Sequence, residues 1–258
     1  MPGLPPSFEP LTRGLGDAIQ WAREAAARYG TIGPRHRRGR RFGRMGEGSA
    51  VCFPVAALFG EEYIHLGERV VIGPYCSLSA GVAPGHVPLS DPVVVIGDRT
   101  VIGKGSGVVG HQSIRIGSDV WTGHHVYITD ANHGYEDVTT PIGLQFSGPR
   151  PVTIGDGTWL GHGVVVLPGA RVGRHVAVGA GSVVTGELPD FSVAVGNPAR
   201  VIRRYDPREG WQRVDADRPA GPDPARGRAP DPAHRPVAVP ADAEAPPLGF
   251  LQPPAGDG

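Results

Sequence analysis

Residues 154–184 read IGDGTWLGHGVVVLPGARVGRHVAVGAGSVV and carry the clearest pattern in the chain. An aliphatic residue recurs in it at every sixth position: Ile154, Leu160, Val166, Val172, Val178 and Val184. Glycine usually follows that residue. A period of six matches neither the period of an α-helix nor the alternation of a half-buried strand. It therefore indicates a repeat architecture.

The same period appears upstream of this stretch. It gives three further blocks: Leu66, Ile72, Leu78; then Ile96, Ile102, Val108; then Ile116, Thr122, Ile128. We expect each hexad to form a short strand and a turn, and three hexads to form one triangular coil. Successive coils would stack about 4.8 Å apart through backbone hydrogen bonds. The aliphatic side chains would point inward, while Gly, Asp and Asn would form corners that need positive φ or close approach.

The composition fits this architecture. Gly and Pro together account for 68 of 258 residues, yet glycine does not recur at every third place, which excludes collagen. Hydrophobic residues make up 40% of the chain, which argues against disorder throughout. The fold class expected is an all-β solenoid with an N-terminal helix and a disordered C-terminal tail.

The formal net charge of zero is a sum over unlike segments. Residues 1–44 carry nine Arg against three acids, whereas 45–205 and 206–258 each carry three more acids than bases. We predict a helix over 17–29, followed by an arginine-rich run over 35–44. That run is interpreted first as a solvated linker. Contact with the acidic repeats of the same or another chain is the alternative, and nucleic-acid binding is disfavoured because aromatic residues are scarce in the run.

Three segments follow from these patterns: an N-terminal helical and Arg-rich segment at 1–60, a repeat domain at 61–205, and a Pro/Ala-rich tail at 206–258. Two stretches interrupt the repeats, at 84–93 and 134–151, and the second is a long excursion. Long loops on regular scaffolds are usually functional. No apolar run is long enough to span a membrane, no signal peptide is apparent, and two cysteines fit a reducing cytoplasm.

The segments 154–205 and 116–137 resemble the hexapeptide-repeat acyltransferases, including the maltose/galactoside O-acetyltransferases and the xenobiotic acetyltransferases. The motif GAGSVVT…GNPARVIR is the most specific part of the resemblance. The resemblance implies a left-handed parallel β-helix and a homotrimer with active sites between subunits. It also implies transfer of an acyl group, in the first place acetyl, from coenzyme A to a small-molecule hydroxyl or amine. Acyl-CoA would then be a co-substrate, with no tightly bound cofactor and no metal.

His133, in the sequence TDANHG, ends a coil just before the long excursion. By resemblance it is the catalytic histidine. An imidazole can take the proton of an attacking hydroxyl near neutral pH and return it to the departing thiolate. Asp130, Asn132 and Glu136 lie near it in sequence. Each is interpreted first as a turn residue, and orientation of His133 or its substrate is the alternative. His111 and Asn132 are candidate acceptor-binding residues, whereas His124 and His125 are expected to be plain wall residues.

Further roles come from the resemblance, position by position. Trp159 would border the transfer site, the backbone N–H of His162 would face the thioester oxygen, and Ala180 would lie against the pantetheine arm. Groups near the nucleotide end would be Thr185, Arg200 and Arg203. The sequence departs from the family pattern at Gly186, where relatives often carry a cation, and at GSGVVG, where the acceptor-binding Asn of sugar acetyltransferases has no match. Simple maltose or galactoside specificity is therefore not expected.

Two other functional classes use the same scaffold. A metal-dependent hydratase of the γ-carbonic-anhydrase kind needs two histidines five residues apart, and no pair in this sequence has that spacing. A non-catalytic scaffold would lack His133 and the C-terminal motif, both of which are present. The leading prediction is a cytoplasmic CoA-dependent O-acyltransferase acting on a sugar or a related metabolite.

Overall fold

The computed structural model describes residues 9–88 and 90–214. It contains one α-helix, α1 (Glu9–Gly30), which begins eight residues before the predicted start. Short 3₁₀ helices follow at η2 (Gly39–Arg41), η3 (Glu61–Tyr63) and η4 (Ile142–Leu144). Among the described residues, no helix is long and apolar enough to cross a membrane. The tail expected at 206–258 lies outside the described residues from position 215 onward.

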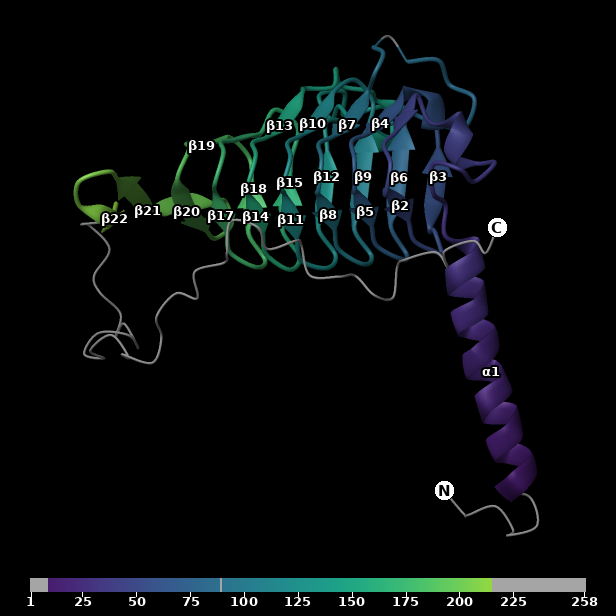
Figure 1. The fold of residues 1–258 in the computed structure, drawn as a ribbon. Coiled ribbons are helices and arrows are strands. Elements are labelled where there is room, and N and C mark those ends of the chain that lie inside the picture. The colour runs from purple at the N-terminus through teal and green to yellow at the C-terminus, as the bar shows by residue number, and fades with distance from the viewer. Residues whose placement is uncertain (1–8, 89, 215–258) are drawn as a thin grey trace. The chain divides into compact units, whose positions relative to one another are not determined.

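The strands form three sheets, and each turn of the chain adds one strand to each sheet in the same order (Figure 1). The first sheet contains β1 (Arg44–Met45), β4 (Ile64–Leu66), β7 (Val94–Ile96), β10 (Ile114–Ile116), β13 (Val152–Ile154), β16 (Arg171–Val172) and β19 (Glu187–Leu188). The second contains β2 (Ala50–Val51), β5 (Val71–Ile72), β8 (Val101–Ile102), β11 (Trp121–Thr122), β14 (Trp159–Leu160), β17 (Ala177–Val178), β20 (Ser192–Val195), β21 (Arg200–Asp206) and β22 (Gly210–Arg213). The third contains β3 (Ala57–Phe59), β6 (Ser77–Ala80), β9 (Gly107–Gly110), β12 (Tyr127–Thr129), β15 (Val165–Val166) and β18 (Val183–Val184).

The pairing between coils is parallel, except where β20, β21 and β22 extend the second sheet as antiparallel strands. This arrangement fits a left-handed parallel β-helix built from hexapeptide repeats. β-structure therefore continues past Tyr205, where the six-residue period stops. Both interruptions of the period leave the coils at the same edge, between the third and first sheets, because they join β6 to β7 and β12 to β13.

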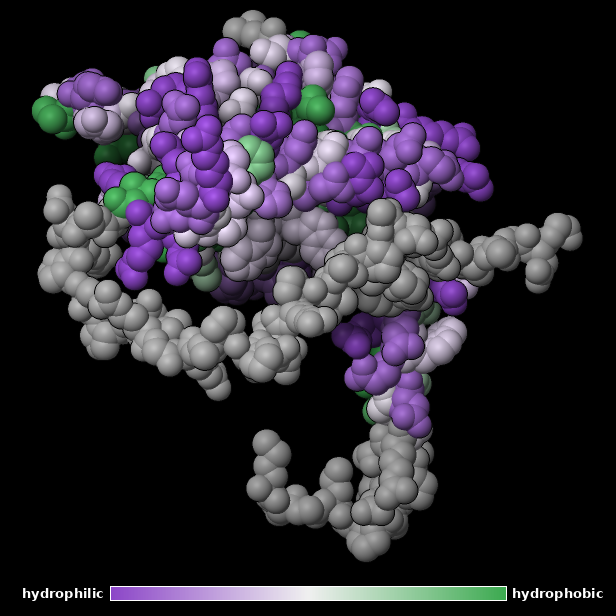
Figure 2. Space-filling model, turned by 60° about the vertical axis from the view of Figure 1, so that its left-hand side comes forward, coloured by the Kyte–Doolittle hydropathy of each residue, from purple (hydrophilic) through white to green (hydrophobic). Residues whose placement is uncertain are grey.

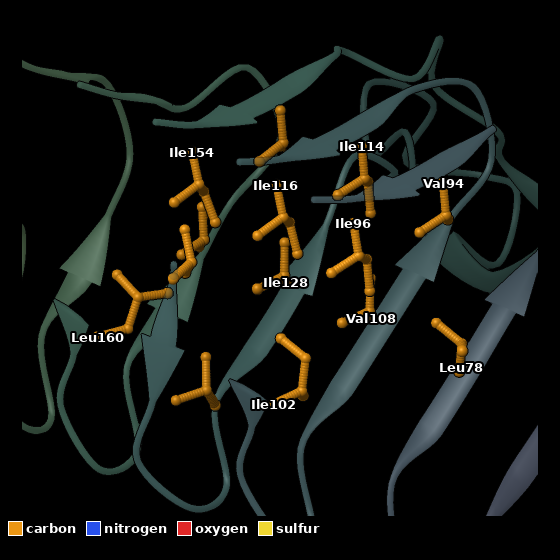
Figure 3. Packing of buried hydrophobic residues seen from close by; sticks show 14 of the residues in the cluster. Leu78, Val94, Ile96, Ile102, Val108, Ile114, Ile116, Ile128, Ile154 and Leu160 are labelled. Carbon is orange, nitrogen blue, oxygen red and sulfur yellow. The ribbon is translucent and has the colours of Figure 1, made fainter. Parts of the chain in front are cut away.

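The repeated aliphatic residues form the core, as the period predicts. All six of the residues that define the period between 154 and 184 are at most 3% exposed. In the first sheet the strand register places Ile96, Ile116 and Ile154 one above another, and in the third it does the same for Val108, Ile128 and Val166. Figure 3 shows these columns meeting inside the coils. The face seen in Figure 2 is mostly hydrophilic, with only scattered hydrophobic patches.

The glycine that usually follows a core residue of the first and second sheets allows successive coils to approach closely. The backbone N–H of Gly97 donates to the carbonyl of Ile116 at 2.8 Å, and a Cβ atom on Gly97 would lie 2.5 Å from the backbone of Gly117 and Ser118. Positive φ occurs two positions later, and glycine is not obligatory there. Seven other residues adopt it, each three places after a core residue: Arg69, Tyr75, Arg99, Asp119, His125, His175 and Phe191.

The arginine-rich run contacts the first coils of its own chain, so its interpretation as a solvated linker is wrong for part of its length. Arg38 Nε lies 3.0 Å from Oε1 of Glu61, whose side chain is buried, and Arg38 Nη2 donates to the carbonyl of Leu58 at 2.9 Å. Arg41 lies 3.9 Å from the other carboxylate oxygen, and Phe42 is buried in the core. The segment thus covers the N-terminal end of the coils, where strands would otherwise be unpaired.

A pair of glycine substitutions tests the close approach of the coils. Gly97→Ala should lower the free energy of unfolding by about 2–3 kcal/mol, because the new methyl group meets rigid backbone. Gly186→Ala is the matched control, since Gly186 has open space around its Cβ position and no positive φ. It should change stability by no more than about 0.5 kcal/mol in urea denaturation. Equal effects at the two sites would contradict the packing argument.

Candidate active site

His133 lies where the chain leaves the third sheet. It follows β12, and the loop from 130 to 151 then returns the chain to β13 in the first sheet. Its side chain is exposed, and an isolated antiparallel bridge pairs it with Phe146 on the returning arm of the loop. The rings of His133 and Phe146 have centroids 6.1 Å apart. The loop therefore presents the imidazole beside an aromatic ring at the edge between the third and first sheets.

The hydrogen bond of the His133 ring determines which nitrogen is free. Nδ1 lies 3.2 Å from the backbone carbonyl oxygen of Gln145. A carbonyl oxygen only accepts, so Nδ1 must carry the hydrogen of this bond. In the neutral imidazole Nε2 is then unprotonated. This is the state in which the ring can remove a proton from a hydroxyl group.

The side chains of Asp130, Asn132 and Glu136 accept backbone N–H groups, as expected of turn residues, and have no described hydrogen bond to the His133 ring. The carboxylate of Asp130 is buried and accepts the backbone N–H groups of His111, Gln112 and Ser113 at 2.7, 2.8 and 2.6 Å. Asn132 Oδ1 accepts the backbone N–H of His133 at 3.0 Å.

Glu136 accepts the backbone N–H of Tyr135, and hydrogen bonds from backbone N–H groups lower the pKa of this carboxyl. The group that does orient the imidazole is a backbone carbonyl, which the sequence analysis missed. A carbonyl belongs to every residue type and leaves no signal in the sequence.

His111 lies on the same edge as His133, one coil earlier. β9 pairs with β12, and the register places Val109 beside Thr129, so both histidines follow neighbouring strands of the third sheet. Asp130 ties the two segments together through the N–H groups it accepts. His111 and His133 therefore border the same part of the edge, which fits an acceptor-binding role for His111.

A second group of predicted residues lies on a different edge, between the second and third sheets. Trp159 is half exposed on β14 and pairs in register with Ala177, so Ala180 follows one coil beyond His162. The backbone N–H of His162 donates no hydrogen bond to a described residue. This N–H group therefore remains available to an acceptor from outside the chain.

His124, His125 and His162 form a cluster on this second edge. The ring centroids of His125 and His162 are 5.5 Å apart, and His124 lies 6.5 Å from each. His124 and His125 thus occupy the corner one coil before that of His162. Within the described ranges, however, no group of three or more His, Cys, Asp or Glu side chains is arranged to hold a metal ion.

The remaining predicted residues lie near the C-terminal end of the coils. Thr185 follows β18 and is exposed. Arg200 and Arg203 lie on β21, opposite Val195 and Val193 of β20. The guanidinium of Arg200 donates to the carbonyl of Ala199 at 3.0 Å. A single chain thus places the predicted site residues on two edges and at one end, and does not bring them to one point.

The outward surfaces of the sheets differ in chemistry. On the second sheet the outward column contains the apolar side chains of Val71, Val101, Trp121 and Trp159. On the third sheet the later coils add those of Tyr127, Val165 and Val183, after Ser77 and Gly107 in the earlier coils. Trp121, Tyr127 and Trp159 are 41–50% exposed. The outward column of the first sheet is mostly polar: Arg44, His65, Val95, Arg115, Thr153, Arg171 and Glu187. The apolar columns flank the edge that carries His162.

Asp130→Asn tests the link between the His111 and His133 segments. The substitution replaces one carboxylate oxygen with an NH₂ group, which cannot accept the backbone N–H groups that this oxygen accepts. The free energy of unfolding should therefore fall by about 2 kcal/mol. Asp206→Asn is the control, because Asp206 is exposed and also accepts backbone N–H groups, from Arg208 and Glu209. The control should stay within about 0.5 kcal/mol in urea denaturation. An unchanged stability for Asp130→Asn would show that the three bonds do not hold the two segments together.

Two segments of the chain match models of known protein families. Residues 151–186 match bacterial transferase hexapeptide (six repeats), and residues 93–129 match the hexapeptide repeat of succinyl-transferase. Similar curated proteins include the probable acetyltransferase Rv3034c of Mycobacterium tuberculosis, 38% identical over 122 residues, which cover 47% of this chain and 40% of that protein. The putative lipopolysaccharide biosynthesis O-acetyl transferase WbbJ of Escherichia coli is 35% identical over 121 residues, which cover 44% of this chain and 62% of WbbJ.

The chain thus spans about half the length of these relatives. Among solved structures, a mutant of AntD, an N-acyltransferase from Bacillus cereus in complex with dTDP and coenzyme A, aligns with a TM-score of 0.57 at 19% identity. That alignment covers 69% of this chain and 92% of AntD, and it shows a shared fold. The six-residue period, the three parallel sheets and the matched repeats agree: residues 93–129 and 151–186 carry the hexapeptide repeats of bacterial transferases, in a chain that is similar to acetyltransferases.

Proposed function

We propose that this protein transfers an acyl group, in the first place acetyl, from coenzyme A to a hydroxyl group of a sugar or related small metabolite. The observation that carries the proposal is the imidazole of His133, held at the edge of the coils with Nδ1 bonded to a carbonyl and Nε2 free. Similarity to acetyltransferases supports acyl transfer as the reaction in which this base takes part. The name of WbbJ, an O-acetyl transferase of lipopolysaccharide biosynthesis, favours a hydroxyl on a sugar as the acceptor.

In the proposed reaction, Nε2 of His133 takes the proton of the acceptor hydroxyl as its oxygen attacks the thioester carbonyl. The tetrahedral intermediate places negative charge on the former carbonyl oxygen. The free backbone N–H of His162 is suited to stabilise that oxyanion. Collapse of the intermediate breaks the carbon–sulfur bond, and the protonated imidazole returns its proton to the departing thiolate. Phe146 beside the imidazole offers an apolar surface to the ring face of a sugar.

The complete site requires two chains in this proposal. His133 and His111 lie on one edge of the coils, whereas Trp159, His162 and Ala180 lie on another. The exposed apolar columns beside the second edge favour contact with a further copy, because such surfaces mark interfaces between proteins. A homotrimer, in which each neighbouring pair forms one site, would bring His133 of one copy to His162 of the next. The left-handed sense of the coils and the nucleotide-end roles of Thr185, Arg200 and Arg203 belong to the same proposal.

Removal of the base tests the reaction. His133→Ala should lower the rate of acetyl transfer from acetyl-CoA by at least about hundredfold, the usual contribution of a positioned general base. Binding of acetyl-CoA, measured by isothermal titration calorimetry, should remain close to that of the parent chain. His175→Ala, at an exposed corner between the first and second sheets, should leave the rate unchanged. A His133→Ala rate within tenfold of the parent rate would remove His133 from the mechanism.

Mixed oligomers test the two-chain site. His133→Ala and Ala180→Glu should each abolish transfer, the first by removing the base and the second by placing a carboxylate where the cofactor must lie. Co-refolded mixtures should regain about a quarter of the parent activity. One site in four of a closed ring would then combine an intact His133 with an intact Ala180 from the neighbouring copy. A mixture as inactive as its components would place the whole site within one chain.

A further inference from the structure

The side chain of Gln145 joins the two arms of the loop that carries His133. Its Nε2 donates to the backbone carbonyls of Asp137 and Thr140, each at 2.7 Å, and its Oε1 accepts the backbone N–H of Asp137 at 3.1 Å. Both N–H groups of the carboxamide and its oxygen are therefore used. Such a set of bonds fixes the rotamer of the side chain and the position of the main chain from which it extends.

The turn that receives this carboxamide is itself held in place. The carboxylate of Asp137 accepts the backbone N–H of Thr139 at 2.8 Å and the hydroxyls of Thr139 and Thr140 at 2.7 and 2.6 Å. These bonds, led by the Thr140 hydroxyl, lower the pKa of Asp137 to about 2, so the carboxylate stays ionised at neutral pH. The carboxamide of Gln145 is thus fixed to an ordered turn.

The main chain of the same residue meets the imidazole. The carbonyl oxygen of Gln145 accepts the backbone N–H of Gly134 at 3.0 Å and lies 3.2 Å from Nδ1 of His133. The side chain and the carbonyl of Gln145 therefore link the Asp137 turn to the histidine ring. Without the carboxamide bonds, only the main-chain bonds to Gly134 and Ile142 would hold the carbonyl that meets Nδ1.

We propose that Gln145 is a positioning residue, whose side chain holds its own carbonyl oxygen against Nδ1–H of His133 and so keeps Nε2 of the neutral ring unprotonated. This inference rests on the proposed function of His133 as the base. A histidine side chain free in water favours the opposite tautomer, with hydrogen on Nε2. In that tautomer Nε2 carries a hydrogen and cannot accept the proton of a hydroxyl group. The hydrogen bond from Nδ1–H of His133 to the Gln145 carbonyl, here called the clamp, therefore sets the fraction of the neutral imidazole that can accept a proton at Nε2.

The test combines spectroscopy with kinetics in the full chain. Nitrogen-15 chemical shifts of the His133 ring should report the Nδ1–H tautomer in the parent protein. In Gln145→Met, which keeps the length of the side chain but none of its hydrogen bonds, the shifts should move toward the Nε2–H tautomer. The kcat for acetyl transfer should fall about tenfold to a hundredfold, while the KM for acetyl-CoA stays within about twofold, because the ring remains present but is misdirected.

Ser147→Ala is the matched control within the same loop. It removes the bond from the Ser147 hydroxyl to the carbonyl of Asn132 but leaves the Gln145 carbonyl untouched. Its tautomer should match that of the parent, and its kcat should stay within about threefold. Gln145→Glu provides a second variant that retains one acceptor oxygen but loses both donors, and it should move the tautomer in the same direction as Gln145→Met.

An unchanged Nδ1–H tautomer in both Gln145 variants would overturn the proposal, whatever their activity. A parent ring already in the Nε2–H tautomer would overturn it as well. The spectra are recorded without substrate, so they decide the role of Gln145 separately from that of His133. If His133→Ala retained transfer while the Gln145 variants changed the tautomer, the clamp would stand and the proposed function would fail.

Discussion

Hydrogen bonds between the backbones of successive coils hold the whole structure. The strands are mostly two to four residues long, too short to be stable by themselves. They persist because each coil donates to the next, as Gly117 does to Ile154 and Gly155 to Val172, both at 2.8 Å. At Gly117 and Gly155 this close spacing leaves no room for a Cβ atom, which would lie within 2.8 Å of the next coil's backbone. The repeated glycine is therefore a packing requirement, while positive φ is required two residues later.

The same stacking orders the side chains of the coils into columns. Inward columns are aliphatic apart from Thr122, and the outward column of the first sheet is mostly polar, whereas large apolar side chains gather on the outward faces of the second and third sheets. In a regular coil every side chain points either into the core or straight outward from a sheet. Few of these directions orient a basic side chain toward a bound substrate. His133 avoids this limit because it sits where the chain leaves the coils. The loop supplies the irregular geometry that the stack of coils excludes.

The features that follow from the six-residue period could be predicted from the sequence. The positions of Ile96, Ile116 and Ile154 in one buried column follow from the period, as does the place where the long loop leaves the coils. The sequence leaves open whether the arginine-rich run contacts the coils, because a run of like charges does not indicate its partner. The ion pair of Arg38 with Glu61 therefore could not be predicted.

Other features required the register of the coils. His124 and His162 are 38 residues apart, and their proximity depends on how many residues the excursion adds to one coil. The contact of the Gln145 carbonyl with His133 could not be predicted from residue type, because every residue has a carbonyl. The contact arises from the position of Gln145 in the chain.

In the loop between β12 and β13, polar residues hold the shape of the loop and apolar residues form its exposed surface. Its shape is fixed by polar bonds, centred on Gln145 and on the carboxylate of Asp137. Its large apolar side chains take little part in that network and remain 58–95% exposed: Tyr135, Val138, Ile142, Leu144 and Phe146. A loop folded on an apolar core of its own would have hidden these groups. Because hydrogen bonds hold the loop instead, it keeps the imidazole oriented and still offers apolar surface to an acceptor or a neighbouring chain.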